Sequence, residues 1–160
     1  MRGSEFEAAA EKYKDNIYAV AFNFFRNSVD ADDIVQDVLL KLYKTEKEFS
    51  SQEHVRNWLL RVTVNQCRKV SVSSWFRKHM PLEDYAESLK YETPEQSDLF
   101  FAVMRLPKKY RIIVHLFYYE DYSTREIAAM LKLKEPTVRT RLARARKLLK
   151  ERLSDVWNEE

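Results

Sequence analysis

The sequence predicts an all-α protein of two small helical domains joined by a flexible linker, the C-terminal one a helix-turn-helix. Three observations support this fold class. Apolar residues recur at helical spacing along almost the whole chain, without the alternation between turn residues that marks strands. An acidic, polar stretch bracketed by Pro81 and Pro94 interrupts that pattern. Near the C-terminus, a helix-start signal, a short turn and a proline-led helix follow one another.

The elements are expected in two groups. Helices are expected at 7–27, 31–46, 53–70, 97–105, 108–119, 124–131 and 136–156. The stretch 81–96 is the expected linker, which leaves a first domain at 7–80 and a second at 97–157. Residues 1–6 look like an expression tag, so we leave them out of the fold. They hold the only glycine, so every later turn has to form without one.

Composition excludes several classes of protein. With 160 residues and 45% hydrophobic content, the chain can bury two small cores and is not a disordered tail. The net charge of +3 is small, but it is unevenly distributed. Residues 136–152 hold seven Lys or Arg and one acid, whereas 28–40 hold four Asp and no base. The two segments therefore face different partners.

No catalytic residue, cofactor or small-molecule substrate is expected. His54, His79 and His115 lack metal-ligand spacing, and neither a phosphate loop nor a nucleophile with a base is visible. The single cysteine, Cys67, excludes a disulfide within the chain and fits a reducing cytoplasm. Since neither a signal peptide nor an apolar run of about 20 residues is visible, we expect a cytoplasmic protein.

The strongest motif is the pair of helices at the C-terminus. Ser123 and Glu126 form a capping-box pattern, and Pro136 suits the first turn of the helix that follows. A buried face is expected on that last helix at Val138, Leu142, Ala145 and Leu149. The opposite face carries Thr140, Ala143, Arg144 and Lys147, with Arg139 at its edge and Arg141 and Arg146 on its flanks. This layout is typical of a recognition helix that enters the major groove, although a solvated basic face is the alternative.

This region resembles region 4 of the extracytoplasmic-function (ECF) sigma factors. The resemblance rests on Leu106-Pro107-x-x-Tyr110-Arg111, Tyr122-Ser123-x-x-Glu126-Ile127-Ala128 and Thr137-Val138-Arg139-x-Arg141-Leu142-x-Arg144-Ala145-Arg146. It implies recognition of the promoter −35 element, with base-facing residues at Arg139, Thr140, Ala143 and Arg144; Thr137, Arg141, Arg146 and Lys147 complete the expected DNA-binding set. The family often has glycine where this chain has Lys132 and Pro136, so a left-handed Lys132 would cost about 1 kcal/mol.

The acidic segment also indicates a partner surface. Asp33, Gln36, Asp37 and Leu40 share one side of the second helix, and an exposed leucine beside acids hints at a protein partner. Alternatively, the acids only complement the start of the helix. The run Asp32-Asp33-Ile34-Val35-Gln36-Asp37 resembles region 2.2 of the same family, "A-E-D-L-x-Q-E". By that match, these four residues bind the coiled coil of the largest subunit of the RNA polymerase core.

The third helix combines apolar and basic residues. We expect two apolar patches, one with Val55, Trp58, Leu59 and Val62, the other with Leu60, Val64 and Cys67. Between them runs a polar stripe of His54, Asn57, Arg61, Asn65 and Arg68, which is either solvated or a track for opened DNA. Trp58-Leu59-x-Arg61-Val62-x-x-Asn65 resembles the "W-L-x-x-I-A-x-N" signature of region 2.3, which implies opening of the −10 element. The expected −10 residues are Trp58, Arg61, Asn65, Arg68 and Lys69, and the segment 68–78 would capture a flipped base.

Together the resemblances imply a sigma factor that binds the core of bacterial RNA polymerase and directs it to promoter DNA. They also imply an anti-sigma factor, often membrane-anchored, that would hold the protein inactive, and a monomer when free. The main alternative is a one-component helix-turn-helix repressor or activator, which would suit the last fifty residues nearly as well. That alternative predicts an effector pocket or a dimer interface in the first domain. An enzyme is the third class, for which the sequence offers no candidate residues.

Overall fold

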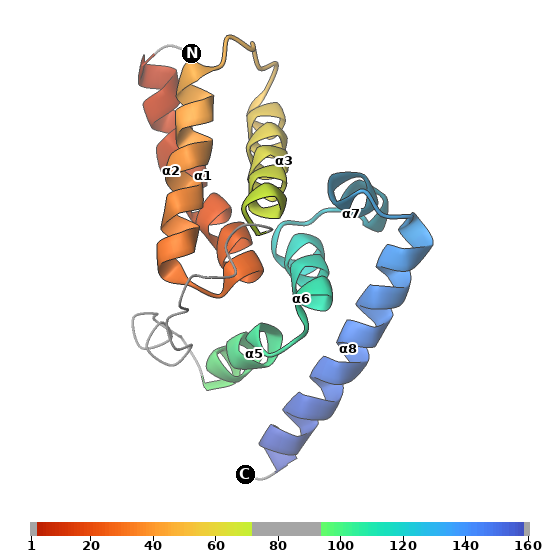
Figure 1. The fold of residues 1–160 in the computed structure, drawn as a ribbon. Helices are drawn as coiled ribbons and strands as arrows, with labels where there is room; N and C mark the ends of the chain where they lie inside the picture. Colours follow the sequence, from red (N-terminus) through yellow and green to blue (C-terminus); the bar gives the residue numbers. More distant parts are fainter. Residues whose placement is uncertain (1–2, 72–93, 159–160) are drawn as a thin grey trace. The chain divides into compact units, whose positions relative to one another are not determined.

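The computed structural model describes residues 3–71 and 94–158, and the chain divides into two compact units, 1–80 and 81–160 (Figure 1). Residues 72–93 lie outside the described residues. Most of the expected linker, and the segment that would capture a flipped base beyond Ser71, fall in that gap. Within the described ranges, no helix combines the length and apolar character needed to cross a membrane.

The first unit is a bundle of α1 (Gly3–Phe25), α2 (Ser28–Lys44) and α3 (Gln52–Ser71). Each helix packs against the other two (Figure 1). Because each helix has apolar residues at helical spacing, the three apolar faces meet in one core. Fully or almost fully buried side chains of this core are Ile17, Val20, Ala21, Ile34, Val38, Leu42, Leu59, Leu60, Val64 and Cys67.

The bend between α1 and α2 forms without glycine. α1 ends because Arg26 adopts the left-handed conformation, with φ of 53°, and its N–H bonds the Phe22 carbonyl at 2.7 Å. The side-chain oxygen of Asn27 then accepts from the Asp30 N–H at 3.0 Å, so Asn27 caps α2. For this reason α2 begins at Ser28, three residues before the expected start.

The first helix is longer than expected. It begins at Gly3, so part of the tag-like segment forms its first turn. The Phe6 ring packs edge-on against Tyr43 of α2, with 5.4 Å between ring centroids. The residues from Gly3 onward therefore belong to α1, whereas the sequence analysis leaves residues 1–6 out of the fold.

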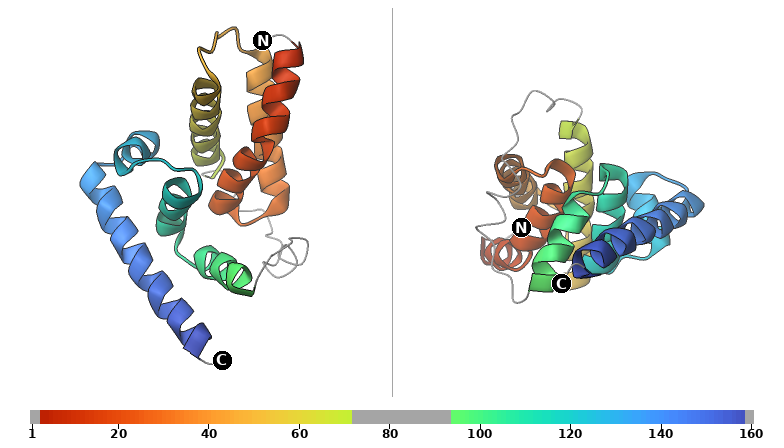
Figure 2. Two further views of the ribbon diagram at one scale, coloured as in Figure 1. Left: turned by 180° about the vertical axis from the view of Figure 1, so that it is seen from behind. Right: turned by 90° about the horizontal axis from the view of Figure 1, so that it is seen from below.

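The second unit contains α5 (Pro94–Met104), α6 (Lys108–Val114), the π-helical turn η1 (His115–Tyr119), α7 (Thr124–Leu131) and α8 (Glu135–Asn158). α8 is a single long helix (Figure 2). It packs against α5, α6 and α7, which places it at the centre of this unit. The core includes Ala102, Val103, Met104, Ile113, Val114, Leu116, Tyr122, Ile127, Val138, Leu142 and Ala145. The α5 helix begins at Pro94, three residues before its expected start, because proline fits the first helical turn.

The expected helix 108–119 changes its pitch halfway. Its last five residues form the wider π turn, in which the Glu120 N–H bonds the His115 carbonyl at 3.2 Å. The turn brings His115 Nε2 to 3.2 Å from Glu120 Oε1, and both side chains are buried. A buried carboxylate needs such a partner because leaving water is costly. Asp121 follows with a φ of 60°, a second left-handed residue that is not glycine.

The turn between α7 and α8 matches its expected chemistry. The Ser123 hydroxyl accepts from the Glu126 N–H at 3.1 Å, and the Glu126 carboxylate accepts from the Ser123 N–H at 3.0 Å. This confirms the capping box. Lys132 ends α7 in the left-handed conformation, with φ of 56° and ψ of 44°, the case for which the sequence analysis gives a cost in strain. The Leu133 N–H bonds the Ala128 carbonyl at 2.9 Å, which closes the turn in the manner of a glycine cap.

Candidate protein-binding and DNA-binding surfaces

The exposed face of α8 carries the residues that the sequence assigns to DNA reading. Val138, Leu142 and Ala145 are buried on one side, and Leu149 continues that side half-buried. The residues that are exposed on the other side are Arg139, Thr140, Ala143, Arg144 and Lys147. The helix therefore presents positive charge and small side chains together, the arrangement that lets a helix approach base edges closely. The Thr140 hydroxyl donates to the Pro136 carbonyl at 2.9 Å, so its oxygen keeps lone pairs for an incoming donor.

The flanks of α8 differ from its exposed face. Thr137 and Arg141 are half-buried, and Arg146 is exposed. The Thr137 N–H bonds the Lys134 carbonyl at 3.0 Å in the first turn of the helix. Flanking side chains of a recognition helix lie nearer the walls of the groove than its floor, so they can contact phosphates rather than bases.

A short polar network supports Arg139. Glu135 Oε1 accepts from the Thr124 hydroxyl at 3.0 Å and lies 3.7 Å from Arg139 Nη1. The first residue of α7 is thus linked through one carboxylate to a candidate base reader on α8. Sequence reasoning missed this link, although an acid four residues before an arginine is a recognisable helix pair.

The exposed side of α2 carries the candidate partner surface. Asp33, Gln36 and Asp37 are exposed, and Leu40 keeps 51% of its surface exposed. Two further apolar side chains on this helix, Val29 at 61% and Tyr43 at 59%, are also exposed. A single helical stripe runs through Val29, Asp33, Gln36, Leu40 and Tyr43. Val29 and Tyr43, at the two ends of this stripe, were not found from the sequence. The alternating spacing of four and three residues along the stripe is the signal that could have found them.

Gln66 of α3 links this surface to the third helix. Its Nε2 donates to Asp37 Oδ2 at 3.3 Å, and its Oε1 accepts from Lys41 Nζ at 2.8 Å. An amide has both a donor and an acceptor end, so it can bridge an acid and a base.

The α3 helix buries one continuous face and exposes the opposite one. Its buried residues are Val55, Leu59, Leu60, Thr63, Val64 and Cys67. The expectation of two apolar patches separated by the polar stripe is therefore wrong: Trp58 and Val62 lie half-buried at the edge of this single face. The buried Thr63 satisfies its hydroxyl by donating to the Leu59 carbonyl at 2.7 Å, which lets a polar residue join the core.

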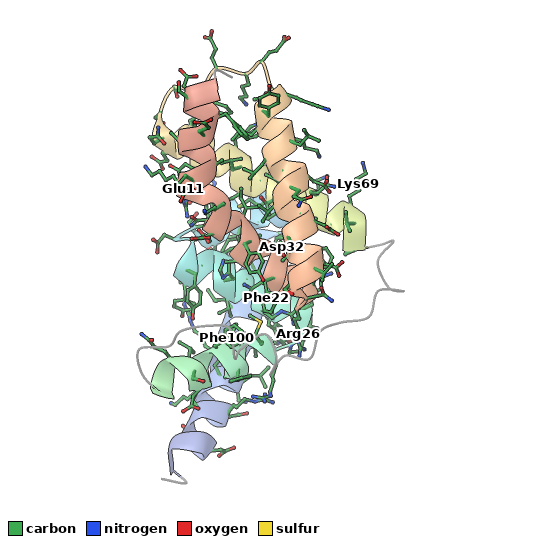
Figure 3. The ribbon with its side chains drawn as sticks, turned by 90° about the vertical axis from the view of Figure 1, so that its left-hand side faces the viewer. Glu11, Phe22, Arg26, Asp32, Lys69 and Phe100 are labelled. Atoms are coloured by element: carbon green, nitrogen blue, oxygen red, sulfur yellow. The ribbon has the colours of Figure 1, made fainter. Side chains whose placement is uncertain are left out.

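The exposed basic line on α3 is shifted from the expected stripe. Arg61, Asn65 and Lys69 are exposed at intervals of four residues, whereas Arg68 is half-buried. The Lys69 side chain extends outward from the first unit (Figure 3). Beside this line, the Trp58 ring packs edge-on against Phe49, with centroids 5.5 Å apart. An aromatic edge next to cations is a surface suited to unstacked bases and phosphates.

The fold defines a two-unit helical protein whose second unit carries a helix-turn-helix pair, α7 and α8. The Sigma-70 region 2 family matches residues 9–79, and the Sigma-70 region 4 family matches residues 98–149. The chain is similar to ECF RNA polymerase sigma factor SigM from Mycobacterium tuberculosis, with 30% identity over 143 residues, 88% of this chain and 73% of SigM. The similarity to RNA polymerase sigma factor SigV from Bacillus subtilis is 28% over 149 residues, 89% of this chain and 87% of SigV. The chain belongs to the ECF sigma factors of RNA polymerase.

A solved structure also shares the fold. It contains the sigma factor RpoE from Bartonella quintana in complex with the anti-sigma factor NepR, and it aligns with a TM-score of 0.68 at 22% identity. The alignment covers 94% of this chain and 97% of that one. At this identity, the likeness establishes the shared helical fold.

Proposed function

We propose that this chain binds the core of a bacterial RNA polymerase, directs it to promoters with matching −35 and −10 elements, and helps to melt the DNA. The observation that carries the proposal is the exposed basic face of α8, held by a capped helix and a tight turn. A free basic helix would bind any DNA, but a recognition helix fixed on a rigid unit can read sequence. The role is one of binding, without a catalytic step.

The proposed polymerase contact is the exposed side of α2. Asp33, Gln36, Asp37 and Leu40 combine negative charge with an exposed leucine. No basic residue lies between Asp33 and Leu40 in the sequence, and the next one, Lys41, is hydrogen-bonded to Gln66. Such a surface suits a basic, partly apolar helical partner, which the family resemblance identifies as the coiled coil of the largest core subunit. Charge complementarity of this kind steers association and excludes wrong partners.

The two DNA contacts are proposed on different units. Arg139, Thr140, Ala143 and Arg144 would read the −35 element in the major groove. The opened strand of the −10 element would be held by the exposed residues Arg61, Asn65 and Lys69 of α3. The half-buried Trp58 and Arg68 lie next to this line and complete the proposed contact.

We further propose that an anti-sigma factor holds this protein inactive by covering the same surfaces. The sigma factor of similar fold described above is bound to such a partner in its solved structure. Since polymerase and promoter DNA are in the cytoplasm, we place the protein there, and a membrane-anchored anti-sigma factor would recruit it to the inner face of the membrane.

Run-off transcription tests the proposal directly. Bacterial core polymerase is supplied with a template library with and without the protein, and new transcripts with defined start sites are expected only in its presence. A one-component regulator would instead bind duplex DNA tightly as a dimer without polymerase and start no transcript from core enzyme. That second result would overturn the proposal.

A further inference from the structure

Arg146 is held in place by two aromatic side chains of η1, Phe117 and Tyr118. Its Nε–H donates to the Tyr118 hydroxyl oxygen at 2.5 Å. Its guanidinium carbon lies 5.5 Å from the Phe117 ring centroid and 5.6 Å from the Tyr118 centroid. The two rings pack edge to face at 4.9 Å, with 80° between their planes, and together they form an aromatic platform beside the cation. An exposed arginine ordinarily samples many rotamers, whereas three contacts fix this one.

The platform reaches the surface through the π turn. Tyr118 keeps 48% of its surface exposed, and Arg146 is exposed beside it although 28 residues separate the two in the sequence. Arg146 lies two helical turns after Arg139, on the same edge of α8. Tyr118 and Arg146 therefore lie on a flank of the proposed base-reading face, where the wall of a major groove would lie.

The hydrogen bond fixes which groups remain available. The Tyr118 oxygen accepts the Nε proton, so the phenolic proton is not used in that bond and can be donated elsewhere. The two terminal nitrogens of Arg146 carry four further N–H donors. Arg146 thus offers a positive charge and several hydrogen-bond donors, and the hydroxyl of Tyr118 adds another donor. The negatively charged oxygens of a phosphate, which only accept hydrogen bonds, suit such a site.

We propose that Tyr118 and Arg146 together form a binding site for one backbone phosphate of the promoter, in which the Tyr118 hydroxyl donates directly to the phosphate. The proposal rests on the proposed −35 function of α8. Residues of the π turn and of the recognition helix would thus bind the same phosphate, and this contact would fix the position of α8 along the groove. This contact carries no base information, so it strengthens binding to all sequences alike.

The test uses holoenzyme assembled from core polymerase and the full chain. The probes are a −35 duplex selected by the wild-type holoenzyme from a randomised library and a shuffled duplex of the same composition. Tyr118→Phe keeps the ring and removes the hydroxyl, and we expect about a five- to tenfold loss of affinity for both duplexes. The dependence of log affinity on log salt should keep its slope, because no charge is removed. Arg146→Ala should lower that slope by about one.

The decisive measurement is Tyr118→Phe in the Arg146→Ala background. A direct phosphate contact predicts that removing the hydroxyl still weakens binding there. If the loss disappears in that background, Tyr118 acts only by holding Arg146, and the proposed direct contact is wrong. An unchanged affinity of Tyr118→Phe alone would also overturn it.

The adjacent Tyr119 provides a matched control. Its ring stacks on His115 at 5.3 Å, and burial raises the pKa of its phenol above the usual value, so Tyr119→Phe also removes only a neutral hydroxyl. That variant should bind both duplexes like wild type. Failure of the underlying −35 function gives a different result, because the wild-type holoenzyme itself would then not distinguish the selected duplex from the shuffled one.

Discussion

The side-chain amide of Gln66 on α3 donates to the carboxylate of Asp37 on α2, with 3.3 Å between the two atoms. The same amide accepts from Lys41, which lies one turn after Asp37 and would otherwise be its natural ion-pair partner. Gln66 therefore bridges the lysine and the carboxylate, and Asp37 remains exposed on α2. Both polar ends of the amide are used in this arrangement.

Reversing the charge of Asp37 should weaken the complex with core polymerase. We expect Asp37→Arg to cost about tenfold or more in affinity, since like charges facing each other at an interface repel strongly. Affinity can be measured by titrating labelled protein with core enzyme, after circular dichroism has shown an unchanged fold. Asp32→Arg makes the same charge change one residue outside the surface. Equal losses in both variants would contradict the assignment of Asp37.

Removing the Gln66 bridge should act on the same equilibrium more weakly. In Gln66→Leu, Lys41 is released to pair with Asp37, so affinity for core should fall by roughly twofold, the scale of an exposed ion pair. Adding Lys41→Gln removes the competing cation and should restore the affinity. A double variant that stays as weak as Gln66→Leu would show that the amide acts in another way.

The exposed line on α3 should act after promoter binding. Alanine at Arg61, Asn65 or Lys69 is expected to slow open-complex formation, because each removes a contact to the separated strand. Binding of the −35 duplex should stay unchanged. Permanganate reactivity of unpaired thymines gives the rate, and Lys14→Ala on α1 is a control for loss of one exposed charge from the same unit. Wild-type permanganate kinetics in all three α3 variants would count against the proposed role.

Substitutions of Arg144 and Arg141 should have different effects on DNA binding, the first on base specificity and the second on overall affinity. A bidentate arginine–guanine pair gives about 1–3 kcal/mol of discrimination, so Arg144→Ala should relax the preference at one or two base pairs. Arg141, on the flank, should contribute mainly salt-sensitive affinity for all sequences. Selection from randomised −35 duplexes separates the two effects. If the Arg144→Ala holoenzyme selects the wild-type motif and merely binds it less tightly, Arg144 is not a base reader.

Lys132 offers a stability prediction that does not depend on function. Its left-handed conformation costs about 1 kcal/mol, and glycine offsets part of the gain because its unfolded chain is more flexible. Lys132→Gly should therefore stabilise the second unit by up to about 1 kcal/mol, seen by calorimetry as a rise of several degrees in its Tm. Lys150→Gly, in an ordinary helical position, should lower the Tm instead. A lower Tm for Lys132→Gly would mean that its side chain makes an unrecognised stabilising contact.

The sequence predicts most of this fold because its signals are local. The start of α7 follows from Ser123 and Glu126, whose side chains cap the helix whatever surrounds it. The exposed face of α8 follows equally from periodicity, since Val138, Leu142 and Ala145 have to be buried together. Such features need no knowledge of distant residues.

The features that sequence reasoning missed depend on contacts between elements. The π turn at 115–119 widens so that His115 can meet Glu120, a pairing that helical spacing alone does not reveal. Gln66 gains its role only because α3 packs beside α2 and brings it to Asp37. On α3, the difference between Arg68 and Lys69 depends on which neighbour covers the edge of the helix, and a one-residue rotation exchanges them.

Because α8 is long, a small tilt of the helix moves its ends by several ångströms. Its 24 residues span about 36 Å, and the proposed readers of DNA occupy only the first half. The second half borders a cleft lined by Leu106, Leu148 and Arg152, against α5. A rigid helix of that length that tilts by about 5° at one end displaces the other by about 3 Å, as far as a hydrogen bond is long. A change at the α5–α8 contact that tilted the whole helix would therefore also move the proposed base-reading residues near its other end.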